Sequence, residues 1–216
     1  MKRYKPTTPG RRHYTVEDRQ MITKDEPFKP LTKSNKKARG RTKGLVTVRH
    51  KGGGNKKLYR EIMMGEEKKG IKGKVKTIEY DPNRSAFIAL VSFSDGDWRY
   101  ILAPNNLKVG DEIICDDITP LKEGNRMRLK NIPIGTMVYN VEIQQGKGGK
   151  LARSAGTAIQ VSGQEENYTY LKMPSSEMRK VMSNCFASIG QLSNLEHSLV
   201  SYGKAGRVRA KGIRPT

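Results

Sequence analysis

The chain has 216 residues and carries 42 Lys or Arg against 21 Asp or Glu, which gives a formal net charge of +21. This length suits one or two modest domains. No run of about eighteen apolar residues occurs, so the sequence predicts no transmembrane helix and no membrane partner, and the N-terminus lacks the apolar segment of a secretory signal.

The basic charge is concentrated at the two ends of the sequence. Residues 1–60 hold nineteen Lys or Arg and four Asp or Glu, a net of +15, while residues 199–216 hold five bases and no acid. Residues 61–198 are almost neutral, at +1. Basic segments of this kind favour nucleic acid, because each neutralised phosphate releases counterions. The alternative is that the charge serves only solubility.

Residues 1–35 are rich in Pro, Thr and Lys and show no sustained periodicity. The composition predicts an extended basic N-terminal tail. Such a segment buries too little apolar surface to offset the entropy lost on ordering, so we expect it to become ordered only on a partner.

The stretch 36–60 is the most basic part of the chain. Leu45 to Val48 is predicted as a short strand, followed by a glycine loop whose backbone approaches nucleic acid closely. A flexible basic linker is the alternative. The candidate side chains for nucleic-acid binding here are Arg39, Arg41, Lys43, Arg49, His50, Lys51, Lys56 and Lys57, and the points of backbone approach are Gly52, Gly53 and Gly54.

A β pattern begins near Gly73. The apolar run 86–93 predicts a central strand, and the preceding D-P-N-R-S at 81–85 predicts a turn. Asp95-Gly96 predicts a hairpin turn, since this pair suits two positive φ values. Further strands are expected at 74–80, 98–103 and 112–115. Short strands at this spacing indicate a small all-β barrel or sandwich.

A second β unit is predicted after a break at 121–125. Its strands are expected at 134–144, 158–162, 168–173 and 178–182, with a final turn or strand at 189–194 and a polar turn at 164–167. Units this small are marginal alone, so we expect the two to pack on one another.

The segment Q-Q-G-K-G-G-K-L-A-R-S-A-G at 144–156 has four glycines and three cations but no acid and no aromatic residue. We interpret it as a phosphate-contacting loop whose N–H groups point together at an anion. A solvated hairpin loop is the alternative. Its candidate contacts are the side chains of Lys147, Lys150, Arg153 and Ser154, and the backbone at Gly146, Gly148, Gly149 and Gly156. The basic C-terminal tail adds Lys204, Arg207, Arg209, Lys211 and Arg214.

Catalytic and metal-binding patterns are weak in this sequence. Lys150 is followed by Leu151, which departs from the Walker loop, and Ser154 has no neighbouring histidine. Asp95 and Asp97 are more simply an exposed turn than a catalytic pair. Cys115 and Cys185 are expected to be reduced and buried, although a disulfide between them stays open. We therefore expect no enzyme, no cofactor, no metal and no small-molecule substrate.

Several motifs occur in a fixed order along the chain. They are G-R-T-K-G-L-V-T-V-R-H-K-G-G-G at 40–54, E-Y-D-P-N-R-S-A at 79–86, R-Y-I-L-A-P at 99–104, N-I-P-I-G at 131–135, G-K-G-G-K-L-A-R-S-A-G at 146–156, S-E-M-R-K-V at 176–181 and G-K-A-G at 203–206. Together they closely resemble the bacterial and organellar type of large-subunit ribosomal protein 2. The likeness covers nearly the whole chain.

This resemblance implies an OB-fold followed by an SH3-like barrel, with basic tails that thread into large-subunit ribosomal RNA. The implied divisions are a tail at 1–35, an OB-fold RNA-binding domain at 36–123, an SH3-like barrel at 124–198 and a tail at 199–216. By similarity, Arg84 and Arg153 contact the RNA. The implied partners are that RNA, neighbouring ribosomal proteins and the small subunit, on a ribosome in the bacterial cytoplasm or in a mitochondrion or plastid.

The resemblance further implies roles in subunit assembly, in subunit association and near the peptidyl-transferase region. The family continues past R-P-T into a glycine- and histidine-rich extension, whereas this sequence ends at Thr216. Natural shortness, a protein in two pieces and a partial sequence are the alternatives for this end. The alternative functions are a free RNA-binding translation or transcription factor with an SH3-like module, and a DNA-compacting protein.

Overall fold

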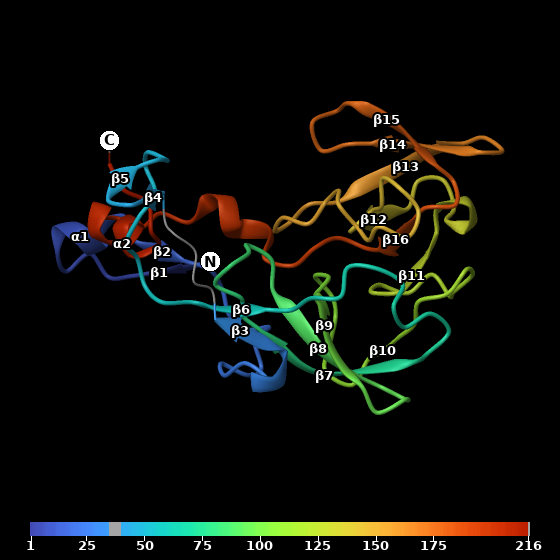
Figure 1. Cartoon of the computed structure of the whole chain (residues 1–216), viewed down its shortest axis with the longest axis horizontal. Helices are drawn as coiled ribbons and strands as arrows, with labels where there is room; N and C mark the ends of the chain where they lie inside the picture. The colour runs from blue at the N-terminus through green and yellow to red at the C-terminus, as the bar shows by residue number, and fades with distance from the viewer. Residues whose placement is uncertain (35–39, 216) are drawn as a thin grey trace.

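The computed structural model describes residues 1–34 and 40–215, and strands dominate it (Figure 1). The first sheet is antiparallel, in the order β10-β7-β8-β9. Its strands are β7 (Gly73–Glu79), β8 (Ile88–Phe93), β9 (Trp98–Leu102) and β10 (Glu112–Ile113). The expected central strand is confirmed, because β8 pairs on both sides and five of its six residues are buried.

An irregular segment closes this sheet into a small barrel, as expected for an OB-like fold. Ile62 makes a parallel bridge to Tyr100 at the β9 edge, and Lys69 makes one to Cys115 beyond β10. The N–H of Gly70 donates to the carbonyl of Cys115 at 2.7 Å. The segment 62–70 therefore spans the gap between the two edge strands.

The turn between β8 and β9 differs in detail from its prediction. Gly96 has a φ of +83°, but Asp95 is not among the residues with positive φ. The N–H of Gly96 donates to the carbonyl of Phe93 at 3.0 Å, and the N–H of Phe93 donates to the carbonyl of Asp97 at 2.9 Å. The turn is thus one residue longer than a two-residue hairpin, so a single left-handed glycine suffices.

The second sheet has six antiparallel strands in the order β11-β16-β12-β13-β14-β15, curled around its own apolar core. The strands are β11 (Arg126–Arg128), β12 (Met137–Tyr139), β13 (Ile159–Gln164), β14 (Tyr168–Lys172), β15 (Met178–Met182) and β16 (Phe186–Ile189). A 3-10 turn, η2 (Leu129–Asn131), lies between β11 and β12. This arrangement agrees with the expected SH3-like barrel.

Two strands of this sheet were not predicted. β11 carries two arginines in three residues, which conceals its pairing with β16. The second unpredicted strand, β16, lies before the turn or strand expected at 189–194: it ends at Ile189, and the chain turns afterwards. Both strands are too short to show a period in the sequence.

The two barrels pack on one another, as expected. Ala86, Leu102, Tyr139 and Leu192 form a buried apolar cluster between them. The N–H of Phe87 donates to the hydroxyl of Ser193 at 3.1 Å across the same joint. In the described part of the chain no helix is long and apolar enough to cross a membrane.

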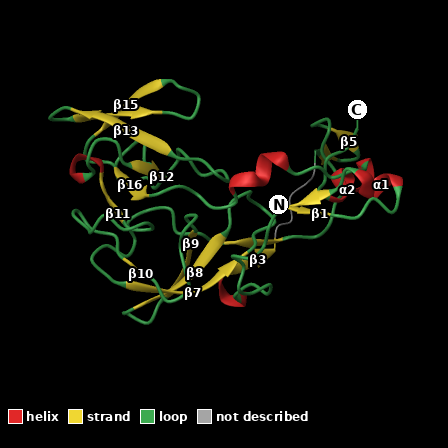
Figure 2. Ribbon diagram, turned by 180° about the vertical axis from the view of Figure 1, so that it is seen from behind, coloured by secondary structure: helices red, strands yellow, loops and turns green. Residues whose placement is uncertain are grey.

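The two terminal segments lie next to each other. Residues 1–16, 40–55 and 199–215 lie together at one end of the molecule, away from the sheets (Figures 1 and 2); we call them the basic lobe. It contains β1 (Lys2–Arg3), α1 (Pro9–Arg12), β2 (Thr15–Val16), β4 (Arg41–Thr42), β5 (Leu45–Val46) and α2 (Ala205–Ala210). Between it and the first barrel lie η1 (Lys29–Leu31), β3 (Thr32–Ser34), β6 (Leu58–Arg60) and η3 (Leu195–Leu199).

Polar contacts, not an apolar core, hold the basic lobe together. The guanidinium of Arg207 donates to the carbonyls of Gly10 and Tyr202, at 3.1 and 2.8 Å, and lies over the ring of Tyr14. Neither α1 nor α2 contains a buried residue. In the described residues, the N-terminal segment therefore contacts the C-terminal segment of the same chain.

Candidate nucleic-acid interface

The turn at 81–85 fixes the position of Arg84. Asp81 is completely buried, and its carboxylate accepts the N–H of Asn83 at 2.8 Å and the Nε–H of Arg84 at 2.5 Å. Arg84 also donates from Nη2 to the carbonyl of Arg60 at 3.4 Å. A buried carboxylate thus orients a guanidinium whose side chain is 17% exposed.

Two open concavities meet at this turn. The first is lined by residues of both barrels, among them Arg84, Lys150, Arg153 and Ser154. The second lies toward the basic lobe, and Lys56, Lys57, Arg60, Arg84 and Lys211 are among its lining residues. Both concavities include Asn83, Arg84 and Ser85. The structure therefore brings together predicted RNA-binding residues from separate parts of the chain.

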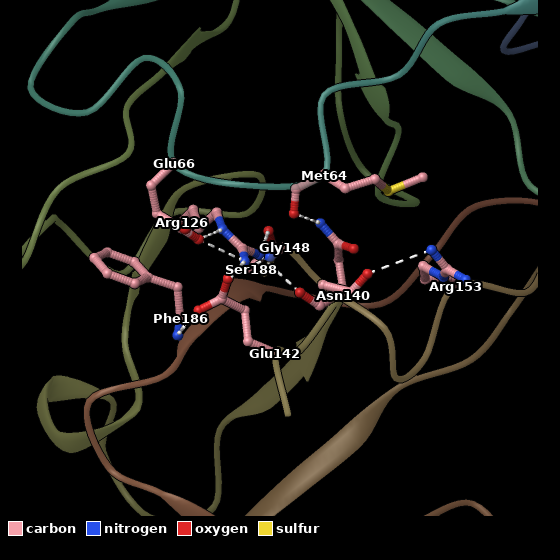
Figure 3. Close-up of polar contacts among 10 residues, drawn as sticks. Met64, Glu66, Arg126, Asn140, Glu142, Gly148, Arg153, Phe186 and Ser188 are labelled. Carbon is pink, nitrogen blue, oxygen red and sulfur yellow. Dashed lines mark hydrogen bonds and ion pairs between the residues drawn. The ribbon is translucent and has the colours of Figure 1, made fainter. Parts of the chain in front are cut away.

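The glycine-rich loop at 144–156 uses its N–H groups inside the protein (Figure 3). Gly148 donates to Oε1 of Glu142 at 2.8 Å, Gly149 to the carbonyl of Met64 at 2.7 Å, and Gly156 to the carbonyl of Ser193 at 3.0 Å. The expectation that these groups converge on an anion is therefore wrong at 148, 149 and 156. At these three positions the loop can offer its cations, but not its N–H groups, to a phosphate.

A buried polar network lies beneath the loop, and sequence reasoning missed it. Arg126 donates from Nε to Glu66 at 2.9 Å and from Nη1 to the carbonyl of Asn140 at 2.7 Å. Burial raises the pKa of Glu66, although Arg126 opposes that shift. The one signal in the sequence was an acid, Glu142, between the apolar residues Val141 and Ile143.

The other predicted residues lie in the basic lobe, and several of them hold it together. The N–H of Gly52 donates to the carbonyl of Gly212 at 3.0 Å, and the N–H of Arg214 donates to the carbonyl of His50 at 2.9 Å. The ammonium of Lys211 contacts the hydroxyl of Tyr202. The remaining candidates in the lobe are Arg41, Lys43, Arg49, Lys51, Gly53, Gly54, Lys204, Arg207 and Arg209. Arg39 lies outside the described residues.

The two carboxylates at the β8–β9 turn, those of Asp95 and Asp97, both form ion pairs. Lys68 lies 2.5 Å from Asp95 and 2.9 Å from Asp97. The hydrogen bond from Lys68 contributes most to lowering the pKa of Asp97 to about 2, so this carboxylate is charged at neutral pH. Cys115 and Cys185 are both free and buried, and burial raises their pKa values to about 12 and about 11.

Two family models match this chain. The model for the RNA binding N-terminal domain of ribosomal proteins L2 matches residues 28–115, and the model for their C-terminal domain matches residues 122–216. The chain belongs to the ribosomal protein L2 family. This assignment makes it a ribosomal protein with an OB-like and an SH3-like barrel, in a family whose role is structural rather than enzymatic.

The gap between the two L2 matches, residues 116–121, lies between β10 and β11, and so between the two barrels along the chain. Lys56, Lys57 and Arg84 lie in the match described as RNA binding, whereas Lys150, Arg153 and Lys211 lie in the C-terminal match. The concavities at the turn therefore combine cations from both L2 domains.

Proposed function

We propose that the chain is a structural constituent of the large ribosomal subunit and binds large-subunit ribosomal RNA. The observation that carries this proposal is the meeting of cations from both barrels and the basic lobe around the turn at 81–85. A folded RNA presents phosphates from several strands at once, and a surface with several cationic segments can neutralise them together.

Recognition is proposed to act through the RNA backbone. Lys56, Lys57, Lys150 and Lys211 supply point charges, while Arg84 and Arg153 supply planar guanidinium groups that suit phosphate oxygens. Phosphate contacts fix position and orientation without reading bases, and RNA helices favour recognition of shape and 2′-hydroxyls.

The remaining candidates extend this surface. We propose that the basic lobe follows the RNA with Arg41, Lys43, Arg49, His50 and Lys51, and with Lys204, Arg207, Arg209 and Arg214. Gly53 and Gly146 are the proposed points of close backbone approach, since a Cβ at either would meet no atom within 4 Å. The proposed functional divisions are residues 1–35, 36–123, 124–198 and 199–216.

In this account the protein has three roles. It supports assembly of the large subunit, it supports association of the large subunit with the small subunit, and it supports the structure of the peptidyl-transferase region. Its proposed partners besides the RNA are neighbouring ribosomal proteins and the small subunit. The ribosome that contains it is proposed to be bacterial, mitochondrial or plastid.

The experiment is sedimentation of the native protein from cell or organelle extract, before and after a high-salt wash. We expect the protein to remain with the large subunit through the wash, because many phosphate contacts act together. A protein that washes off or sediments alone would instead be a free RNA-binding factor, and the proposal would fail.

A further inference from the structure

Glu142 lies at the base of the glycine-rich loop and ties it to the second barrel. Its side chain is completely buried, and both carboxylate oxygens are used. Oε1 accepts the N–H of Gly148 at 2.8 Å, and Oε2 accepts the N–H of Phe186, in β16, at 3.1 Å. The loop is thus attached through one carboxylate to a central strand of the sheet.

Arg126 compensates this buried charge and extends the network to the first barrel. A buried carboxylate is costly unless a cation and hydrogen bonds offset its lost hydration. Nη2 of Arg126, a residue that is 7% exposed, lies 3.9 Å from Glu142, and Nε donates to Glu66. Glu66 belongs to the segment 62–70 that closes the first barrel (Figure 3).

The loop has two further attachments that lead to the RNA-facing side chains. The carbonyl of Met64 accepts the N–H of Gly149, and the carbonyl of Gly149 in turn accepts Nη1 of Arg153 at 3.4 Å. At the far end of the loop the N–H of Ala155 donates to the hydroxyl of Ser85, next to Arg84, at 3.0 Å. The position of Arg153 relative to Arg84 therefore follows from where the loop is held.

We propose that Glu142 is a positioning residue for RNA binding, which fixes the glycine-rich loop so that Lys150 and Arg153 face the same phosphates as Arg84. Glu142 touches no RNA in this account and acts through Gly148 and Arg126. The proposal rests on the proposed RNA-binding function and adds to it a residue without positive charge.

The test exploits the sign of the charge change. Glu142→Gln removes a negative charge, so electrostatics alone would make RNA binding tighter. Loss of positioning would make it weaker, because an amide of the same size can accept only one of the two N–H groups. The matched control is Glu165→Gln, which makes the same charge change at an exposed carboxylate that pairs with Lys180.

We expect Glu142→Gln to bind a large-subunit ribosomal RNA fragment about tenfold more weakly than Glu165→Gln, with a salt dependence flatter by about two ions. Amide exchange at Gly148 and Gly149 should be faster. Binding as tight as that of the control, with exchange at the loop increased, would show that loop position does not matter and would overturn the proposal.

If Glu142→Gln does not fold, Glu66→Gln serves as a second variant that tests the same buried network. It makes the same charge change at a side chain that is 15% exposed and contacts Arg126 from the other barrel. Weaker binding than the control supports the positioning role, and equal or tighter binding overturns it. If the wild-type protein itself shows no salt-dependent RNA binding, the proposed function fails instead.

Discussion

Two glycine-rich segments that carry basic residues, 49–57 and 146–156, have different surroundings. The segment 146–156 lies on the joint between the barrels, where Gly148 and Gly149 donate to a buried carboxylate and to a barrel carbonyl. Gly52–Gly54 lies on residues 210–212 of the basic lobe, and α2 of that lobe has no buried residue. In both segments glycine lets one stretch of backbone lie against another, but only the first rests on a hydrophobic core.

Because of this difference, the loop at 146–156 is a preorganised site, whereas the basic lobe is only weakly held in place. Binding costs less when the contacting groups are already fixed. The loop at 146–156 is fixed by the barrels, whereas the three segments of the basic lobe depend on one another. Regions with few buried contacts open at low free energy. We therefore expect the lobe to gain more order on RNA than the loop does.

The largest effect is expected for Gly149→Ala. A Cβ there would overlap the side-chain and backbone oxygens of Asn140, which is itself buried. Overlap in a packed site costs about 3 kcal/mol, so thermal unfolding of the whole protein should move to lower temperature. Gly146→Ala is the control: its φ is +73° with no atom within 4 Å, so only about 1–2 kcal/mol of backbone strain is expected. Equal losses would contradict the account of the loop.

Gly54→Ala introduces a similar overlap in the other segment. Its Cβ would lie 2.7 Å from the backbone nitrogen of Gly212. Because the basic lobe shares little core with the barrels, we expect faster amide exchange at 210–214 while the barrel melting temperature stays within about 2 °C. A melting shift as large as that of Gly149→Ala would show that the lobe is part of one cooperative unit.

Thiol labelling compares how well the barrel core under the loop and the basic lobe are protected from a reagent in solvent. Cys185 lies in the core under the loop, and burial raises its pKa to about 11, so little thiolate is present at pH 8. We expect native Cys185 to react slowly with an alkylating reagent, and a cysteine placed by Val208→Cys in α2 to react many times faster. Equal rates would mean that the lobe is as well protected as the barrel.

The smallest effect is expected for the contribution of Asp97 to barrel stability at acid pH. The pKa of Asp97 is about 2 in the folded protein against an ordinary 3.8, so its contribution is present above pH 3.8 and lost as the pH falls toward 2. Asp97→Asn should flatten the loss of barrel stability in that window, measured by acid unfolding. Asp25→Asn, at a carboxylate without an ion pair among the described residues, should leave the curve unchanged.

Much of the barrel architecture could be predicted because local chemistry determines it. The apolar run of β8 and the D-P-N-R-S turn each specify their structure within a few residues. β11 and β16 were missed because their pairing depends on residues about sixty positions apart. Short strands of this kind carry no local period.

The candidate site was predicted only in part, because its side chains are local features of the sequence whereas their arrangement depends on distant contacts. Cations such as Arg84 and Arg153 can be assigned to loops from sequence, but their convergence depends on how two barrels pack. The internal use of Gly148 could not be foreseen without its acceptor, Glu142. The basic lobe was missed because Arg207 contacts the backbone carbonyl of Gly10 and the ring of Tyr14, and such contacts leave no hydrophobic pattern in the sequence.

The central claim is that the loop and the turn at 81–85 neutralise RNA phosphates together. The most direct measurement is the affinity for a large-subunit ribosomal RNA fragment as a function of salt, for the wild type and for a variant with Lys147, Lys150 and Arg153 changed to Ala. We predict weaker binding and a salt dependence flatter by about three ions, near one for each cation that the variant removes. An unchanged slope would show that the loop does not bind phosphate and would contradict the account.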